Sequence, residues 1–116
     1  ITNSVFKEIR NKIKITKRGK KLLFLGVTYK ENVSDIRESP AIKIISKFKK
    51  NGFDVLAFDP HANSSKSFIT FKKPNFDDYD YIIILVKHQE FLKFKSLQRN
   101  YKSKIIDVVG IFDSQI

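Results

Sequence analysis

Two uninterrupted apolar runs of six residues, 22–27 and 81–86, constrain the fold of this chain more than any other feature. A strand with one face in water alternates apolar and polar residues, so continuous runs of this kind favour strands covered on both faces. Such strands are typical of parallel sheets with helices on each side. Both runs are far shorter than the roughly 20 apolar residues that cross a bilayer, so the sequence predicts no transmembrane helix and no membrane partner.

Segments with a helical pattern separate the predicted strands. Residues 3–14 repeat apolar side chains at four-residue spacing between charges, which predicts an amphipathic helix. A second helix begins at Ser39-Pro40, a favourable N-cap followed by proline at the first helical position, and Asn51-Gly52 ends it. Further strands are predicted at 53–58 and 104–109, a short one at 68–71, and a partly helical segment at 88–101. This alternation predicts an α/β fold: a three-layer α/β/α Rossmann-like domain with a mainly parallel sheet of four to six strands.

The polar segment 28–39, after the first strand, holds the candidate binding residues. In open α/β sheets, ligands bind where loops follow the carboxyl ends of strands. This segment carries Tyr29, Lys30, Asp35 and Arg37. An aromatic ring can stack on a base, and Lys and Arg contact phosphates, with Arg able to do so bidentately. A solvated loop in which Asp35 pairs with Arg37 is the alternative that spacing alone leaves open.

Several expected signatures of catalysis are absent from the sequence. The first strand is not followed by a G-x-G-x-x-G fingerprint, and no Walker A pattern occurs. Asp59 ends a strand where a dinucleotide-binding fold places its ribose-binding carboxylate, but without the glycines we interpret Asp59-Pro60 mainly as a turn. His61 and His88 lie on different loops without a partner at metal-ligand spacing, so we interpret both as surface or loop-packing residues. The chain also has no cysteine that could serve as a nucleophile or as a thiolate metal ligand. We therefore predict neither a catalytic residue nor a metal site.

The formal net charge of +11 predicts attraction to polyanions. It does not distinguish nucleic acids from phosphorylated metabolites, and a solvated, lysine-rich surface is the explanation that the composition favours. A stand-alone basic α/β module that binds nucleic acid is therefore an alternative. The sequence contains no known nucleic-acid-binding motif, so we do not expect a nucleic-acid partner.

Residues 26–41 read GVTYKENVSDIRESPA. This run closely resembles the signature that opens the C-terminal domain of the UDP-glucose/GDP-mannose dehydrogenase family. Residues 55–61 resemble a strand end of the same family, 82–91 resemble its strand followed by H-x-E-F, and 106–112 resemble its closing V-D-x-x-G-I-(F/Y). The resemblance thus covers nearly the whole chain in order.

The resemblance implies a three-part enzyme with an N-terminal NAD-binding domain, a helical dimerising centre and this C-terminal UDP-binding domain. Such enzymes oxidise the 6-hydroxyl of a UDP-sugar to a carboxylate, with NAD as cofactor and a cysteine of the central region. It implies that Tyr29 and Lys30 contact the nucleotide-sugar and that Arg37 reaches toward the NAD phosphates. Asp35 is implied to hold the loop or to orient Arg37.

The chain begins at Ile1 and contains no Met, so we expect a piece of a longer protein. We expect residues 1–16 to be the tail of the connection from the missing central domain and residues 17–116 to be the C-terminal domain. NAD would be bound mainly by the absent N-terminal domain, so this piece alone should be inactive. The resemblance implies a cytoplasmic parent, a homodimer or larger, that makes UDP-uronates for surface polysaccharides such as capsules.

One departure from the family pattern bears on the substrate. Many UDP-glucose enzymes carry an arginine shortly after the last strand, whereas this chain has Asp107-Val108-Val109 there. This departure, with the H-x-E-F stretch, favours a UDP-N-acetylhexosamine as the substrate. It also leaves a degenerate, non-catalytic homologue as an alternative.

Overall fold

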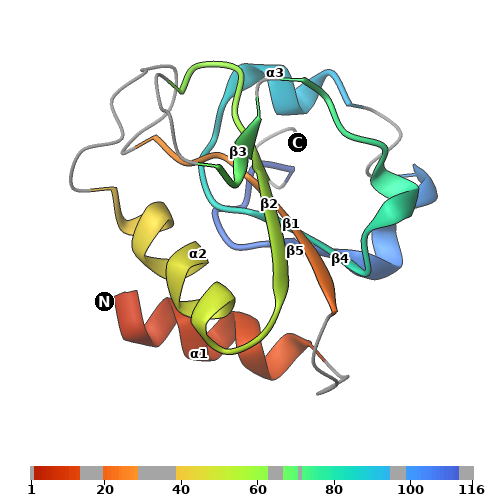
Figure 1. Ribbon diagram of the computed structural model, residues 1–116. Helices are drawn as coiled ribbons and strands as arrows, with labels where there is room; N and C mark the ends of the chain where they lie inside the picture. Colours follow the sequence, from red (N-terminus) through yellow and green to blue (C-terminus); the bar gives the residue numbers. More distant parts are fainter. Residues whose placement is uncertain are drawn as a thin grey trace.

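The computed structural model describes residues 2–13, 20–28, 39–62, 67–70, 72–94 and 99–112. Its centre is a five-stranded sheet in the order β3-β2-β1-β4-β5, in which every paired neighbour is parallel (Figure 1). The strands are β1 (Lys21–Leu25), β2 (Asp54–Phe58), β3 (Ile69–Thr70), β4 (Tyr81–Ile84) and β5 (Ile105–Asp107). The prediction of a parallel α/β sheet is confirmed.

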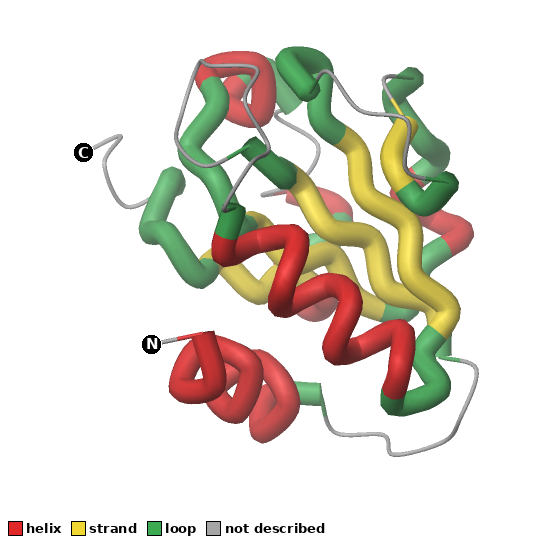
Figure 2. The backbone as a smooth tube through the Cα atoms, turned by 60° about the vertical axis from the view of Figure 1, so that its left-hand side comes forward, coloured by secondary structure: helices red, strands yellow, loops and turns green. Residues whose placement is uncertain are grey.

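Helices cover both faces of the sheet, which makes the three predicted layers. The long helices α1 (Thr2–Lys12) and α2 (Pro40–Lys50) lie on one face, with α2 beside the sheet and α1 next to α2 (Figure 2). The short helices η1 (Phe76–Asp78), α3 (Gln89–Leu92) and η2 (Lys102–Lys104) pack on the other side. No helix among the described residues is long and apolar enough to cross a membrane.

The apolar run in β1 contributes to both cores because successive side chains point to opposite faces of a strand. Leu22 and Phe24 face α1 and α2, whereas Leu23 and Leu25 face the short helices. All four are fully buried. This explains why the strand is apolar throughout instead of alternating.

Helix α2 is fixed at both ends by the residues that the sequence singled out. The Ser39 hydroxyl accepts a hydrogen bond from the Ile42 amide at 3.4 Å, so the predicted N-cap is confirmed. Gly52 has a positive φ of 92° directly after the helix, a conformation that favours glycine. Between these ends, Phe48 packs its ring against Phe6 and Phe53 at centroid distances of 4.5 and 5.4 Å. These contacts hold α2 in a fixed position relative to the sheet.

The order of the strands creates a switch point between β1 and β4. From β1 the chain moves through α2 to β2 and β3 on one side, then crosses to β4 and β5 on the other side. Connections on the two sides of such a point diverge, and the crevice at the carboxyl ends of the strands is where ligands bind in open α/β sheets. The fold therefore places its candidate site at the ends of β1 and β4.

Candidate functional site

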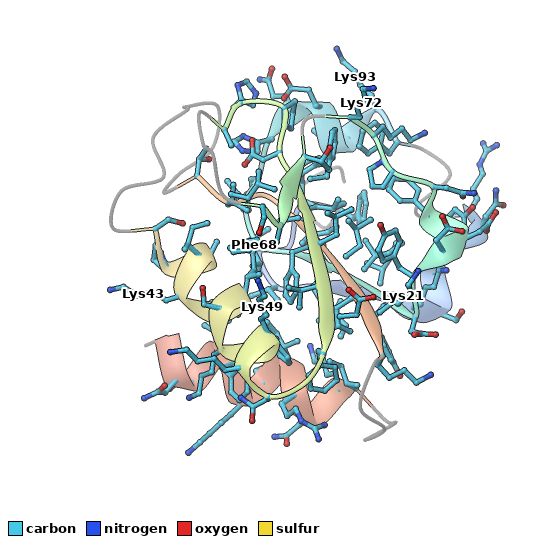
Figure 3. All side chains as sticks on the ribbon, viewed as in Figure 1. Lys21, Lys43, Lys49, Phe68, Lys72 and Lys93 are labelled. Carbon is cyan, nitrogen blue, oxygen red and sulfur yellow. The ribbon has the colours of Figure 1, made fainter. Side chains whose placement is uncertain are left out.

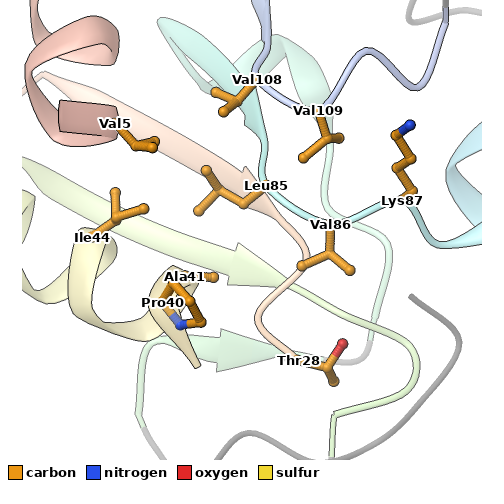
Figure 4. A pocket seen from close by; sticks show the side chains of 10 residues that line it. All are labelled: Val5, Thr28, Pro40, Ala41, Ile44, Leu85, Val86, Lys87, Val108 and Val109. Carbon is orange, nitrogen blue, oxygen red and sulfur yellow. The ribbon is translucent and has the colours of Figure 1, made fainter. Parts of the chain in front are cut away.

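A pocket of about 480 Å³ lies at the predicted edge of the sheet, next to the switch point (Figure 4). It is formed by the segments that follow β1, β4 and β5, together with the first two turns of α2 and one side chain of α1. The described lining residues are Val5, Thr28, Pro40, Ala41, Ile44, Leu85, Val86, Lys87, Val108 and Val109. The wall is mostly apolar, and Thr28 and Lys87 are the polar side chains among these ten. An apolar wall with few polar groups is typical of a small-molecule site.

The shape of the pocket depends on a close approach of the backbone after β1 to the backbone after β4. Gly26 has a φ of +100°, and a Cβ atom placed on it would lie 2.5 Å from Cβ of Val86 and 2.9 Å from its backbone nitrogen. Only glycine adopts this conformation without strain and leaves room for this contact. The first residue of the GVTYK run is thus required by the geometry of the switch point.

Asp59, the last residue before the turn after β2, is fully buried behind this approach. One carboxylate oxygen, Oδ2, accepts hydrogen bonds from the amides of Val27 at 2.7 Å and Thr28 at 3.3 Å. The other, Oδ1, accepts from the amide of His61 at 2.8 Å. The bond to His61 closes the turn that the sequence predicted at Asp59-Pro60. The bonds to Val27 and Thr28 show that the carboxylate also holds the end of β1.

His88, which precedes α3, is the side-chain partner of this carboxylate. Its Nε2 lies 2.8 Å from Oδ2 of Asp59 and 3.0 Å from Oγ1 of Thr28, and its ring is fully buried. Burial alone would raise the pKa of Asp59, but the hydrogen bonds from His88 and Val27 outweigh it and hold that pKa below its ordinary value. The carboxylate is therefore ionised at neutral pH and can only accept, so Nε2 of His88 carries the proton.

A second histidine–carboxylate pair covers the buried one. Nε2 of His61 lies 2.8 Å from Oε1 of Glu90, and the His61 ring stacks on His88 with centroids 4.5 Å apart. Partial burial would raise the pKa of Glu90, but the hydrogen bond from His61 outweighs it and lowers that pKa. The two pairs do not form a metal site: within the described ranges, no group of three or more His, Cys, Asp or Glu side chains could hold a metal ion.

The two ends of the segment that follows β1 are joined at the backbone of Val27. The Ser39 hydroxyl donates to the carbonyl oxygen of Val27 at 2.6 Å, while the Val27 amide donates to Asp59. Ser39 is buried and caps α2 at the same time. Residues 27–28 and 39 are therefore fixed relative to one another.

Asp107, the last residue of β5, holds the turn that forms one edge of the pocket. Its carboxylate accepts hydrogen bonds from the amides of Ile111 at 3.0 Å and Phe112 at 3.2 Å, across a turn in which Gly110 has a φ of +67°. This turn places Val108 and Val109 on the pocket wall. The position where an arginine was expected from the resemblance is thus apolar and lies at the pocket.

The charged side chains of the described residues do not gather at the pocket. In Figure 3 the labelled lysines point in different directions from several elements: Lys21 from β1, Lys43 and Lys49 from α2, and Lys72 and Lys93 from the opposite end of the molecule. Some lie over aromatic rings, such as Lys49 over Phe68 at 5.6 Å and Lys21 over Tyr79 at 5.9 Å.

The residues that the sequence analysis singled out differ in whether the structure describes them. Tyr29, Lys30, Asp35 and Arg37 lie outside the described residues, although the fixed ends of their segment border the pocket. The histidines were interpreted as surface or loop-packing residues, and the structure adds that each one pairs with a carboxylate, which the sequence did not predict. The sequence signal for the buried pair is only that an acidic and an imidazole side chain each follow a predicted strand, and the strand order that brings them together comes from the fold.

Comparisons with known proteins agree with this geometry. The sequence profile of the UDP binding domain of the UDP-glucose/GDP-mannose dehydrogenase family matches residues 23–114. A UDP-N-acetyl-D-mannosamine dehydrogenase of Methanococcus vannielii is 33% identical over 100% of this chain and 28% of its own length. Another of Methanocaldococcus jannaschii is 39% identical over 83% of this chain and 24% of its own length. This chain therefore spans about a quarter of these relatives.

Solved structures give the same result. The UDP-N-acetyl-mannosamine dehydrogenase of S. aureus superimposes with a TM-score of 0.69 at 30% identity, covering 95% of this chain and 27% of that one. A GDP-mannose dehydrogenase of Pseudomonas aeruginosa has a TM-score of 0.70 at 17% identity, over 95% of this chain and 28% of its own, which shows the shared fold. The chain belongs to the UDP-glucose/GDP-mannose dehydrogenase family, as the part that corresponds to its UDP binding domain.

Proposed function

We propose that this chain is the nucleotide-sugar-binding part of an NAD-dependent UDP-sugar 6-dehydrogenase, which oxidises its substrate to a UDP-uronate. The observation that carries the proposal is the apolar pocket at the switch point, in a domain whose sequence matches a UDP binding domain. Residues 1–16 would continue from a central domain, and an N-terminal domain would hold NAD. The parent would be a cytoplasmic homodimer or larger assembly in surface-polysaccharide synthesis.

The state of Asp59 supports a nucleotide-sugar, and not NAD, as the ligand of this domain. In a dinucleotide-binding fold, the carboxylate at the end of the second strand binds the ribose hydroxyls. Here the carboxylate is fully buried and accepts from three backbone amides and His88. It has no exposed oxygen for a ribose, and the glycine-rich cradle for a pyrophosphate is missing from the sequence.

The pocket offers groups suited to the parts of a nucleotide-sugar. The amino end of α2, at Pro40 and Ala41, carries the positive end of the helix dipole, and the exposed Lys87 adds a cation on the wall. Both favour a diphosphate. The family resemblance implies that Tyr29 and Lys30 contact the nucleotide-sugar, where they would add an aromatic ring and a cation. Arg37, oriented by Asp35, would reach toward NAD.

The apolar wall supports a UDP-N-acetylhexosamine as the substrate. Val108 and Val109 lie where many UDP-glucose enzymes carry an arginine, and they line the pocket without a charge. An acetamido methyl group is suited to such a surface, because burying apolar area contributes about 25 cal/mol per Å². Two of the relatives described above are named UDP-N-acetyl-D-mannosamine dehydrogenases, which agrees with this choice.

Titration of the 116-residue chain with UDP, UDP-N-acetylhexosamines and NAD, followed by amide NMR shifts, tests the proposal. We expect weak binding of the uridine nucleotides, about millimolar, with shifts at Thr28, Val86 and Val109. NAD should leave these amides unchanged. Lys87→Ala should weaken UDP binding several-fold, because a charge-assisted contact at an exposed site contributes about 1 kcal/mol.

Lys93→Ala is the matched control, since Lys93 is also exposed but lies outside the pocket lining. It should bind UDP as the unaltered chain does. Binding of DNA or RNA at physiological salt, without any response to uridine nucleotides, would contradict the proposal and favour a nucleic-acid-binding module. No binding of any of these ligands would favour a degenerate homologue.

A further inference from the structure

The buried pair of Asp59 and His88 joins the carboxyl ends of three strands. Asp59 follows β2, His88 follows β4, and the amides of Val27 and Thr28 that they hold follow β1. Neither side chain lines the pocket, yet Thr28, which contacts both, does. The pair therefore acts on the pocket through the backbone of residues 27–28.

We infer that Asp59 and His88 are positioning residues for nucleotide-sugar binding. Together with Ser39, they fix the backbone of residues 27–28, which borders the pocket at Thr28. The inference rests on the proposed function, because that function assigns the nucleotide-sugar to the pocket that Thr28 lines.

The contacts hold the same residue, Val27, from two sides. The Val27 amide donates to Asp59 at 2.7 Å, and the Val27 carbonyl accepts from Ser39 at 2.6 Å. Ser39 also caps α2, whose first turn lines the pocket. Both ends of the connection between β1 and α2 are thus fixed before a ligand arrives, which reduces the ordering entropy that binding must overcome.

The chemistry of the pair explains why a carboxylate and an imidazole are needed. Asp59 accepts from four donors, and an asparagine in its place would present one acceptor oxygen and an NH₂ group that can only donate. The charge of Asp59 is compensated by these donors, and the groups that face the pair from the neighbouring elements are Thr28, His61 and Glu90. Removing the donor at His88 leaves a buried carboxylate without its side-chain partner, which is costly.

The test uses the 116-residue chain with UDP as the ligand and measures two quantities in each variant. The first is hydrogen exchange of the Val27 and Thr28 amides, which reports whether the backbone is held. The second is the UDP dissociation constant, from the NMR titration. The variants are Asp59→Asn, His88→Leu and His88→Gln, since Gln can place an amide donor near the position of Nε2 and Leu cannot.

We expect Asp59→Asn and His88→Leu to speed exchange of both amides at least tenfold and to weaken UDP binding about tenfold. His88→Gln should recover most of both losses, to within about threefold of the unaltered chain. Glu90→Gln is the matched control: it alters the half-exposed outer pair and should leave both quantities within twofold. If His88→Leu does not fold, Asp59→Asn and His88→Gln decide the question.

Faster amide exchange with unchanged UDP affinity would overturn the positioning role and leave a purely structural pair. Equal losses in His88→Leu and His88→Gln would overturn the role of the donor. If the unaltered chain does not bind UDP at all, the proposed function fails and the positioning role fails with it. Unchanged exchange in Asp59→Asn, with UDP bound normally by the unaltered chain, overturns the positioning role alone.

Discussion

Replacing Gly26 by alanine should strongly destabilise the domain, because two separate penalties meet at this position. The φ of +100° is strained for any residue with a Cβ, which costs on the order of 1–3 kcal/mol. The added Cβ would lie 2.5 Å from Cβ and 2.9 Å from the backbone nitrogen of Val86. Neither atom can move away by a rotamer change, so the backbones at Gly26 and Val86 must separate. Such overpacking destabilises a protein by about 1–3 kcal/mol.

The sum is about 2–6 kcal/mol, a large part of the roughly 5–15 kcal/mol that stabilises a typical domain. For a chain of this size, each kcal/mol lowers Tm by roughly 4 °C, so Gly26→Ala should melt about 8–24 °C below the unaltered protein. Urea unfolding followed by circular dichroism measures the free energy of unfolding directly. Gly52→Ala is the control for backbone strain, because Gly52 also has a positive φ, 92°, but is exposed. It should lose only about 1–2 kcal/mol.

A double variant separates the two penalties. Val86→Ala removes Cγ2 of Val86, which would lie 2.9 Å from the new Cβ, but leaves the nearer Cβ and the backbone nitrogen in place. We therefore expect it to recover less than about 1 kcal/mol of the loss caused by Gly26→Ala. A Gly26→Ala protein within 1 kcal/mol of the unaltered one would refute the close approach of the backbones that follow β1 and β4. Full recovery in the double variant would show that the side-chain contact alone sets the cost.

Three further predictions concern the carboxylate, the cations and the activity. Asp59→Asn should cost about 2–4 kcal/mol at pH 7. Because folding lowers the pKa of Asp59, its contribution to the free energy of unfolding is present above about pH 4 and is lost as the pH falls through the folded pKa. In urea titrations over this pH range, the free energy of unfolding of the variant should therefore decline less than that of the unaltered chain. In the full-length parent, Lys30→Ala should raise KM for the UDP-sugar about tenfold and Arg37→Ala should mainly raise KM for NAD; unchanged kinetics would return the segment to a solvated loop. The 116-residue chain alone should not reduce NAD with a UDP-sugar, since it has no cysteine, and measurable turnover would contradict this.

The sequence predicted the fold well because the constraints that determine it are local. The apolar runs at 22–27 and 81–86 require burial on two faces, and Ser39 and Gly52 mark the ends of α2 through their own hydrogen bonding and backbone freedom. β1, β4 and β5 each end two residues earlier than predicted, whereas β2 ends at Phe58 as predicted. β1 stops at Leu25 because the positive φ of Gly26 turns the chain, a property that an apolar run does not report.

The site was predicted only in part, because its network joins residues far apart in sequence. Asp59 and His88 are 29 positions apart, and both reach the end of β1 from strands on its two sides. Whether β2 and β4 flank β1 depends on the strand order, which local patterns do not contain. The turn at Asp59-Pro60 was recognisable from its residue types, whereas the four donors that surround the carboxylate were not.

The direction in which Asp59 points has a consequence for ligand choice in this fold. A carboxylate at the end of the second strand can face outward to a ribose or inward to the end of the first strand. In this chain it faces inward, and its burial is compensated by three amides and one imidazole. With the carboxylate occupied, the proposed function leaves ligand selection to the pocket wall that follows β1, β4 and β5. That wall is apolar at Val86 and Val109 and has Lys87 beside it, a combination that suits a base or an acetamido group next to a diphosphate better than a second ribose.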